Sequence, residues 1–126
     1  MASSWKVQLP AQTKVYVYGY TNAAHQQKVK LTLKNGTVLT FTGSGENNTP
    51  TTPPSTTFTT PADLSYSVQI DISCLTNGTW TPSNVKGAGT FLQAAGVFVV
   101  SSDDTARDGD FNDSCLVLMW YNPVAA

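Results

Sequence analysis

Eleven consecutive residues, Asp103–Asp113, hold most of the acidic side chains of this chain. Eight acidic residues occur among its 126 residues, and five of them fall in this segment. Only one cation, Arg107, accompanies them, so the segment carries a net charge of −4 in a chain whose net charge is −1. Carboxylates this close repel one another unless a cation neutralises them. The cluster therefore predicts a binding site for a hard metal ion.

The donor set favours calcium, and more than one ion. Four Asp and one Asn between positions 104 and 113 offer up to nine side-chain oxygens, whereas a single Ca²⁺ takes about six to eight. Two ions that share carboxylates are therefore a natural interpretation, and magnesium is less favoured because it keeps its waters. The spacing from Asp108 starts like an EF-hand loop, but Asp113 stands where that loop needs Gly and Met119 where it needs Glu. An EF-hand is excluded.

Short apolar runs flank the acidic segment on both sides. Residues 96–101 and 115–121 are almost wholly apolar, β-branched or aromatic, which is typical of buried strands. Asn35-Gly36 is a strong hairpin signal, whereas residues 43–62, rich in Thr, Pro, Gly and Asn, predict a long loop. Alternating or apolar runs predict further strands at 5–9, 13–20, 28–34, 37–41, 66–72 and 90–94.

These patterns together predict an all-β fold. We expect one domain over residues 1–126, a single-domain antiparallel β-sandwich of about nine short strands without an internal repeat. A chain of this length can bury roughly two-thirds of the surface that it exposes when unfolded. Two core strands would then hold the acidic segment between them, which is a rigid place for oxygen ligands.

Composition limits the partners and the compartment. Charged residues are only 12% of the chain, which argues against nucleic acid and anionic membranes as partners. No apolar run approaches the roughly 18 residues of a membrane span, so no membrane insertion is expected. The start has no signal-peptide region, so we expect a cytoplasmic protein, export without a conventional signal peptide, or a lost leader. Cys74 and Cys115 fit no zinc spacing, and two free thiols are favoured over a disulfide.

Some residues allow two interpretations. Tyr16, Tyr18 and Tyr20 share one face of the strand at 13–20. A second core or a subunit interface is favoured there over a platform for a sugar. The single histidine, His25, has no partner in the sequence for nucleophilic catalysis, and a surface position is favoured.

One motif in the acidic segment is specific. It reads Asp104-x-x-x-Asp108-x-Asp110-x-Asn112-Asp113 and is followed by an apolar strand that ends in Trp120. This pattern resembles the two-calcium bacterial lectins of the LecB type, which bind fucose and mannose. The resemblance extends to residues 18–24 and 40–48 and covers most of the chain, most densely at 14–48 and 97–120.

The resemblance implies a calcium-dependent lectin domain with two Ca²⁺ ions per subunit, which coordinate sugar hydroxyls directly. The implied metal ligands are Asn22, Asp104, Asp108, Asp110, Asn112 and Asp113. The implied sugar-binding residues are Ala23, Ala24, His25, Asp104, Asp108, Asp110, Asn112 and Asp113. Glycans that contain mannose or fucose, outside the cell, are then the expected partners, with the chain forming a homo-oligomer, a dimer or a tetramer.

Three sequence features depart from the family pattern or refine it. Asp104 stands where the family usually has Glu, so its coordination could be monodentate, or Asp103 could assist. Residues 121–126 differ from the Gly-terminated end that enters a neighbouring subunit's site in the family. Ala23 stands where fucose-preferring members have Ser, which implies mannose ahead of fucose.

Two other classes of function were weighed. Asp110-x-Asn112-Asp113 also resembles the inter-domain linker of cadherins, so a calcium-rigidified β-sandwich adhesion or structural domain without sugar binding is the alternative. Glycoside hydrolysis needs two carboxylates about 5–9 Å apart with one of them protonated. The acids outside the segment, Glu46, Asp63 and Asp71, show no such pairing. We therefore expect a protein that is not an enzyme.

Overall fold

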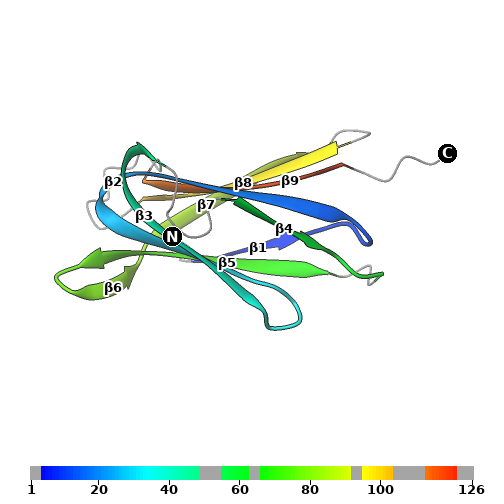
Figure 1. The fold of residues 1–126 in the computed structure, drawn as a ribbon, viewed down its shortest axis with the longest axis horizontal. Coiled ribbons are helices and arrows are strands. Elements are labelled where there is room, and N and C mark those ends of the chain that lie inside the picture. Colours follow the sequence, from blue (N-terminus) through cyan, green and yellow to red (C-terminus); the bar gives the residue numbers. More distant parts are fainter. Residues whose placement is uncertain (1–3, 49–54, 63–65, 92–94, 104–112, 122–126) are drawn as a thin grey trace.

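A computed structural model describes residues 4–48, 55–62, 66–91, 95–103 and 113–121 of the chain (Figure 1). Within these ranges there is no helix, and the strands are β1 (Ser4–Gln8), β2 (Lys14–Thr32), β3 (Val38–Asn48), β4 (Ser55–Thr59), β5 (Ser67–Thr76), β6 (Thr79–Pro82), β7 (Asn84–Phe91), β8 (Ala95–Asp103) and β9 (Ser114–Tyr121). Every pairing among them is antiparallel. The predicted all-β, antiparallel class is confirmed.

The long strand β2 connects the two layers of the fold. Its first part, Lys14–Thr21, pairs with β9 and β4, whereas its last part, Gln27–Thr32, pairs with β5. Its register with β3 shifts between these parts, from Ala23 opposite Gly45 to Gln27 opposite Gly43. Irregularities of this kind let one strand turn a corner between packed sheets. The strand therefore belongs to both layers, and its corner lies at residues 22–26.

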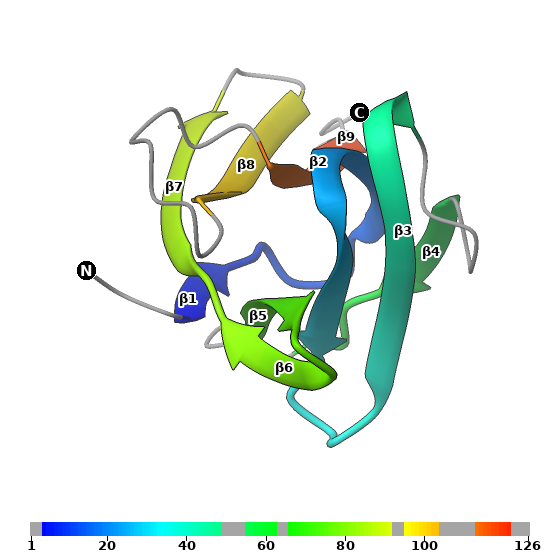
Figure 2. The same cartoon turned by 90° about the vertical axis from the view of Figure 1, so that its left-hand side faces the viewer.

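The sheet runs β1-β5-β2-β9-β8-β7, with β3 and β4 joined to β2 and β6 joined to β5. Because β2 bends, the sheet curves over an interior that Figure 2 shows end-on. The two ends of this order also meet: β1 contacts β7, and a Cβ at Gly87 would lie 2.6 Å from the indole nitrogen of Trp5. Gly87 thus allows the Trp5 ring to lie against the backbone of β7.

The core lies between the two layers and is built by strict alternation. Along β9, for example, every second side chain from Leu116 to Trp120 points inward and is fully buried. The opposite layer supplies its own set from β2, β3 and β5: Val29, Leu31, Phe41, Val68, Ile70 and Ile72. Burial of each such side chain contributes about 1.5–3 kcal/mol. The apolar side chains of these strands therefore hold the two layers together.

The turn predicted at Asn35-Gly36 forms, and a second Asn-Gly turn forms at Asn77-Gly78. At Asn35-Gly36, Gly36 has φ of +92° and the Leu33 N–H donates to the Thr37 carbonyl at 2.8 Å. At Asn77-Gly78 both residues have positive φ, 51° and 77°, and Thr76 pairs directly with Thr79. The second turn is therefore the tight two-residue hairpin, whereas the first is longer than a two-residue turn.

Three expectations about the strands need correction. Residues 13–20 and 28–34 were expected as separate strands, but β2 is continuous from Lys14 to Thr32. The long loop expected at 43–62 is interrupted, because β3 continues to Asn48 and β4 forms at Ser55–Thr59. The strand expected at 90–94 begins earlier, as β7, and residues 92–94 lie outside the described residues. No helix in the described ranges is long and apolar enough to cross a membrane.

Candidate functional site

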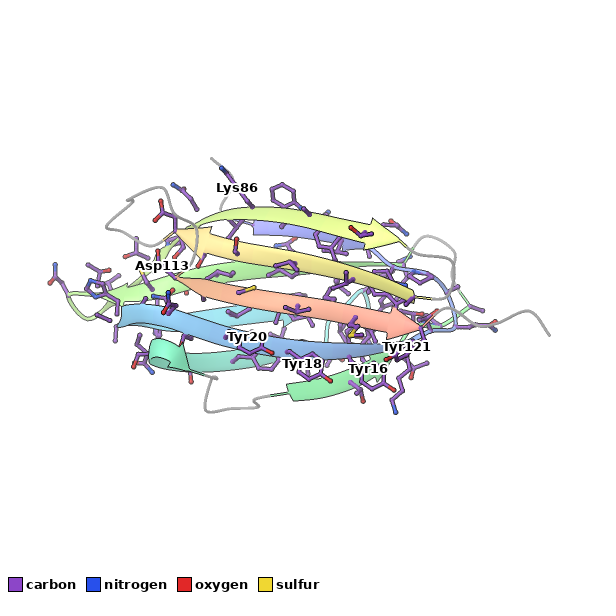
Figure 3. All side chains as sticks on the ribbon, turned by 90° about the horizontal axis from the view of Figure 1, so that it is seen from above. Tyr16, Tyr18, Tyr20, Lys86, Asp113 and Tyr121 are labelled. Atoms are coloured by element: carbon purple, nitrogen blue, oxygen red, sulfur yellow. The ribbon has the colours of Figure 1, made fainter. Side chains whose placement is uncertain are left out.

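The acidic segment leaves and rejoins the sheet at one edge of two neighbouring strands. β8 ends at Asp103, β9 begins at Ser114, and Ser102 pairs with Ser114 across them. Asp113 precedes β9, and its N–H donates to the Ser102 carbonyl at 3.0 Å. The roots of the segment, residues 102–103 and 113–114, are thus fixed by the ladder between β8 and β9, as the flanking apolar runs predicted. Figure 3 shows Asp113 at the start of β9.

The corner of β2 lies against these roots. The Asn22 N–H donates to the Asp113 carbonyl at 2.8 Å, and Thr21 pairs with Ser114 in the ladder of β2 and β9. Two of the metal ligands implied by the sequence, Asn22 and Asp113, are therefore brought together although ninety residues of chain separate them. The other four, Asp104, Asp108, Asp110 and Asn112, lie outside the described residues.

Two carboxylates at the roots are buried. Asp103 is 3% exposed and Asp113 is 8% exposed. Burying carboxylates is costly unless charges of opposite sign or hydrogen bonds compensate them. An oxygen-rich donor set with buried carboxylates at both roots fits a hard divalent cation such as Ca²⁺. Outside residues 104–112, the described part of the chain holds no group of three or more His, Cys, Asp or Glu side chains that could bind a metal.

The residues implied at the edge of the sugar site occupy the corner of β2. Ala23 is 6% exposed and pairs with Gly45, whereas Ala24 and His25 are exposed. The exposed position expected for His25 is confirmed. Ala24 and His25 lie within the second register shift of β2 and β3, between Ala23 and Gln27.

A buried chain of polar groups lies behind this site and was not foreseen. Gln27 is 1% exposed; its Nε2 donates to the His25 carbonyl at 3.1 Å, and its Oε1 accepts from the Ser114 hydroxyl at 3.3 Å. The Ser114 and Ser102 hydroxyl oxygens are 2.7 Å apart. One feature of the sequence indicated it. Gln27 is in step with the inward-facing Val29 and Leu31, but it is polar where they are apolar.

The tyrosine row faces outward from the first layer. Tyr18 is 38% exposed, and Figure 3 shows it between Tyr16 and Tyr20 on β2. A shallow hollow of about 210 Å³ is lined by Tyr16, Tyr18, Met119 and Tyr121. The rings of Tyr16 and Tyr121 meet edge to face, with centroids 6.2 Å apart. These exposed side chains do not form a second core among the described residues.

The thiols and the single buried Trp of β9 behave as expected. Cys74 is buried and Cys115 is half-buried, and neither forms a disulfide. Burial raises the pKa of the Cys115 thiol above its ordinary value. Trp120 is fully buried in the core, where its indole lies over Gly96 of β8.

Solved structures of bacterial lectins share this fold. A high-affinity mannose-binding lectin of Ralstonia solanacearum matches with a TM-score of 0.74 and 29% identity, over 95% of this chain and 96% of that one. The Chromobacterium violaceum lectin CV2L, solved in complex with alpha-methyl-fucoside, matches with the same TM-score and coverage at 26% identity. The C-terminal domain of the BC2L-C lectin from Burkholderia cenocepacia, at 20% identity and a TM-score of 0.71, shares the fold.

Comparison by sequence gives one clear result. A search of curated proteins found no significant match. The profile of the fucose-binding lectin II (PA-IIL) family, however, matches residues 7–122, which is nearly the whole chain. The match includes both roots of the acidic segment and the corner of β2, and it agrees with the resemblance seen in the sequence. The chain belongs to the fucose-binding lectin II (PA-IIL) family.

Proposed function

We propose that this protein is a calcium-dependent lectin in which two Ca²⁺ ions, held by residues 104–113 and Asn22, bind hydroxyls of mannose or fucose. The observation that carries the proposal is the contact between Asn22 and Asp113. It places the acidic segment and the corner of β2 side by side in a member of a lectin family. The mannose-binding and fucoside-bound structures that share the fold support the class of sugar.

The proposed ligand sets follow the family motif. Asp104, Asp108, Asp110 and Asp113 would hold one ion, and Asn22, Asp110, Asn112 and Asp113 the other. When bound, the ions supply coordination positions for adjacent sugar hydroxyls, and their charge makes each contact stronger than a neutral hydrogen bond. Asp110 and Asp113 serve both ions, so their loss is expected to affect the site most.

The protein supplies a fixed frame for this binding. The ladder between β8 and β9 fixes Asp113, and the hydrogen bond between Asn22 and Asp113 fixes the corner of β2 beside it. Ala23, Ala24 and His25 would then line one edge of the sugar. Because the frame is a rigid sheet, little ordering entropy is spent when the sugar binds. The proposed role is binding and not catalysis, and glycans outside the cell are its proposed targets.

Assembly into a homo-oligomer, a dimer or a tetramer, is part of the proposal. The outward tyrosine face supports it, because exposed aromatic side chains and Met are enriched at the centres of protein interfaces. A second copy of the chain would cover the hollow between Tyr18 and Tyr121 and remove apolar surface from water.

Calorimetric titration with methyl α-D-mannoside tests the proposal. We expect binding in millimolar calcium and none after removal of calcium by a chelator. Asp110→Ala should abolish binding, because it removes an oxygen ligand from both ions. Asp71→Ala is the matched control: Asp71 lies on β5 and pairs with Lys30, away from the corner, so its loss should leave the affinity unchanged.

Glu46 is a poorer control, although it also lies outside the acidic segment. It follows Gly45, which pairs with Ala23 at the corner of β2.

Full sugar affinity in Asp110→Ala would show that Asp110 does not bridge two ions. Calcium binding without any sugar binding would instead favour a calcium-stabilised structural domain.

A further inference from the structure

Gln27 is a fully buried carboxamide in an apolar strand, directly after the corner of β2. Such a group must satisfy both its donor and its acceptor within the protein, because an unpaired buried polar atom destabilises the folded state. Gln27 does so in two directions. Its Nε2 donates to the His25 carbonyl at 3.1 Å, and its Oε1 accepts from the Ser114 hydroxyl at 3.3 Å.

The first of these bonds holds the backbone of the corner. His25 lies between the pairs Ala23–Gly45 and Gln27–Gly43, where three residues of β2 face one of β3. Residues at such an irregularity are displaced from the regular ladder. The Gln27 side chain therefore gives the His25 carbonyl a hydrogen bond where the β2–β3 register is broken.

The second bond reaches the roots of the acidic segment. Ser114 is the first residue of β9 and Ser102 the last but one of β8, and each is at most 1% exposed. The Ser114 N–H donates to the Ser102 hydroxyl oxygen at 3.1 Å, and the two hydroxyls lie 2.7 Å apart. Because the Ser114 hydroxyl donates to Gln27, the Ser102 hydroxyl donates to Ser114. The side-chain donors of Ser102, Ser114 and Gln27 therefore all point toward the corner of β2.

We propose that Gln27 is a positioning residue that holds the corner of β2, residues 22–26, at a fixed place relative to Ser102 and Ser114, next to which the proposed calcium-binding segment begins and ends. The inference rests on the proposed function and extends it to a residue that contacts neither metal nor sugar. Two buried side-chain hydrogen bonds connect the two elements that would bind one sugar. A shift of either element by a fraction of an ångström weakens binding without removing any ligand.

The test compares Gln27→Met with Gln8→Met. Met has nearly the length and volume of Gln but forms neither hydrogen bond. Gln8 offers a control for the loss of the same type of bond at an exposed position, because its Nε2 also donates to a backbone carbonyl, that of Tyr66 at 2.9 Å. It lies opposite Ser67 on β5, whereas Gln27 lies opposite Cys74 on the same strand. Seven residues of strand separate the two places, about 23 Å.

Three dissociation constants are measured in each variant. Titration with calcium alone gives the first, and separate titrations with methyl α-D-mannoside and methyl α-L-fucoside at saturating calcium give the other two. We expect Gln27→Met to weaken calcium binding, to weaken sugar binding by about three- to tenfold, and to change the mannose-to-fucose ratio. Gln8→Met should leave all three unchanged. A purely structural role would lower the melting temperature but leave the dissociation constants of the folded protein as they are.

Ser114→Ala keeps the experiment decisive if Gln27→Met does not fold. It removes one hydroxyl from the middle of the chain, adds no bulk, and should weaken sugar binding in the same direction. The double variant should lose less than the sum of the two single losses, because both break the same chain. Additive losses, or a folded Gln27→Met with unchanged constants for calcium and sugar, would overturn the proposal.

The outcomes also separate this inference from the proposed function. If the unaltered protein binds calcium but no sugar, the proposed function fails, and the calcium constant of Gln27→Met still decides the role of Gln27. If the unaltered protein binds neither calcium nor sugar, both proposals are wrong.

Discussion

Position 23 is where we expect a single side chain to change the preference between sugars. Ala23 is almost buried at the corner of β2, next to Asn22, whose N–H contacts Asp113. A hydroxyl at this position would need a hydrogen-bond partner, and an adjacent sugar hydroxyl can provide one. The alanine provides no such contact, which removes about 0.5–1.5 kcal/mol from the sugar that would use it.

We therefore expect the unaltered protein to bind D-mannose ahead of L-fucose, and Ala23→Ser to shift the ratio toward fucose. The shift should be up to roughly tenfold and should exclude neither sugar. Calorimetry with the two methyl glycosides measures the ratio. Ala88→Ser is the control, because it adds the same hydroxyl at an exposed position of β7, outside the proposed site. Fucose clearly ahead in the unaltered protein would contradict the argument from Ala23 while leaving the calcium site intact.

At the same scale, the sequence reveals ligands more readily than the groups that position them. Asp113 and Asn22 stand out through charge and motif, and the structure brings their backbones into contact. Gln27, Ser102 and Ser114 carry no charge and form no motif, and only the fold brings them together. Their role depends on a contact between Gln27 and Ser114, which are 87 positions apart. A single sequence does not reveal which distant residues come into contact.

At the scale of elements, the strands of the core were predictable and the corner was not. β5, β8 and β9 follow plain alternation or apolar runs, and they form close to where the pattern places them. β2 continues through residues 22–26, which read Asn-Ala-Ala-His-Gln, because β3 pairs with it on both sides of its irregularity. Partner strands thus override the weak strand preference of a stretch that contains Asn and Ala.

β7 was largely missed for a related reason. Its residues 84–89 include two glycines and a lysine, a composition with low strand preference. The strand forms because it pairs with β8 along its whole length. Its glycines also leave room for aromatic rings: a Cβ at Gly87 would lie 2.8 Å from Phe98. Tertiary packing selects glycine here although local preference argues against a strand.

Gly96 of β8 offers a test of this packing. It pairs with Trp120, and a Cβ at this position would collide with the indole ring. We expect Gly96→Ala to lower the free energy of unfolding by about 1–3 kcal/mol, because the ring must leave its place in the core. Urea denaturation measures the change. Ala88→Val, on the exposed face of β7, adds methyl groups to an adjacent strand and should change it by about 0.5 kcal/mol or less.

At the scale of the whole molecule, the exposed surface around Tyr18, Tyr20 and Tyr121 predicts that copies of the chain assemble into an oligomer. Light scattering should give the mass of a dimer or a tetramer, and Tyr18→Ser should reduce the mass or weaken the association, because a polar side chain replaces an aromatic contact. Val38→Ser is the control: Val38 is 45% exposed, but it lies on β3 in the other layer. A monomeric unaltered protein, or equal effects of both substitutions, would contradict an interface at the tyrosines.

Calcium and folding should be coupled through the same roots that position the site. Asp103 and Asp113 are buried at the ends of β8 and β9, so a cation that neutralises the segment stabilises the folded sheet but not the unfolded chain. At a thousandfold excess of calcium over its dissociation constant, the gain is about 4 kcal/mol. For a domain of this size that corresponds to a rise in melting temperature of roughly 10 to 20 °C.

Thermal melts in millimolar calcium, in magnesium and in chelator measure this coupling. Magnesium should raise the melting temperature less than calcium, because it resists losing its waters to a site rich in carboxylates. In Asp110→Ala the calcium-dependent rise should shrink, since one oxygen ligand of both ions is gone, whereas Asp71→Ala on β5 should keep it. Melts of the unaltered protein that superimpose in calcium and chelator would contradict the metal site, and with it the binding of sugar through calcium.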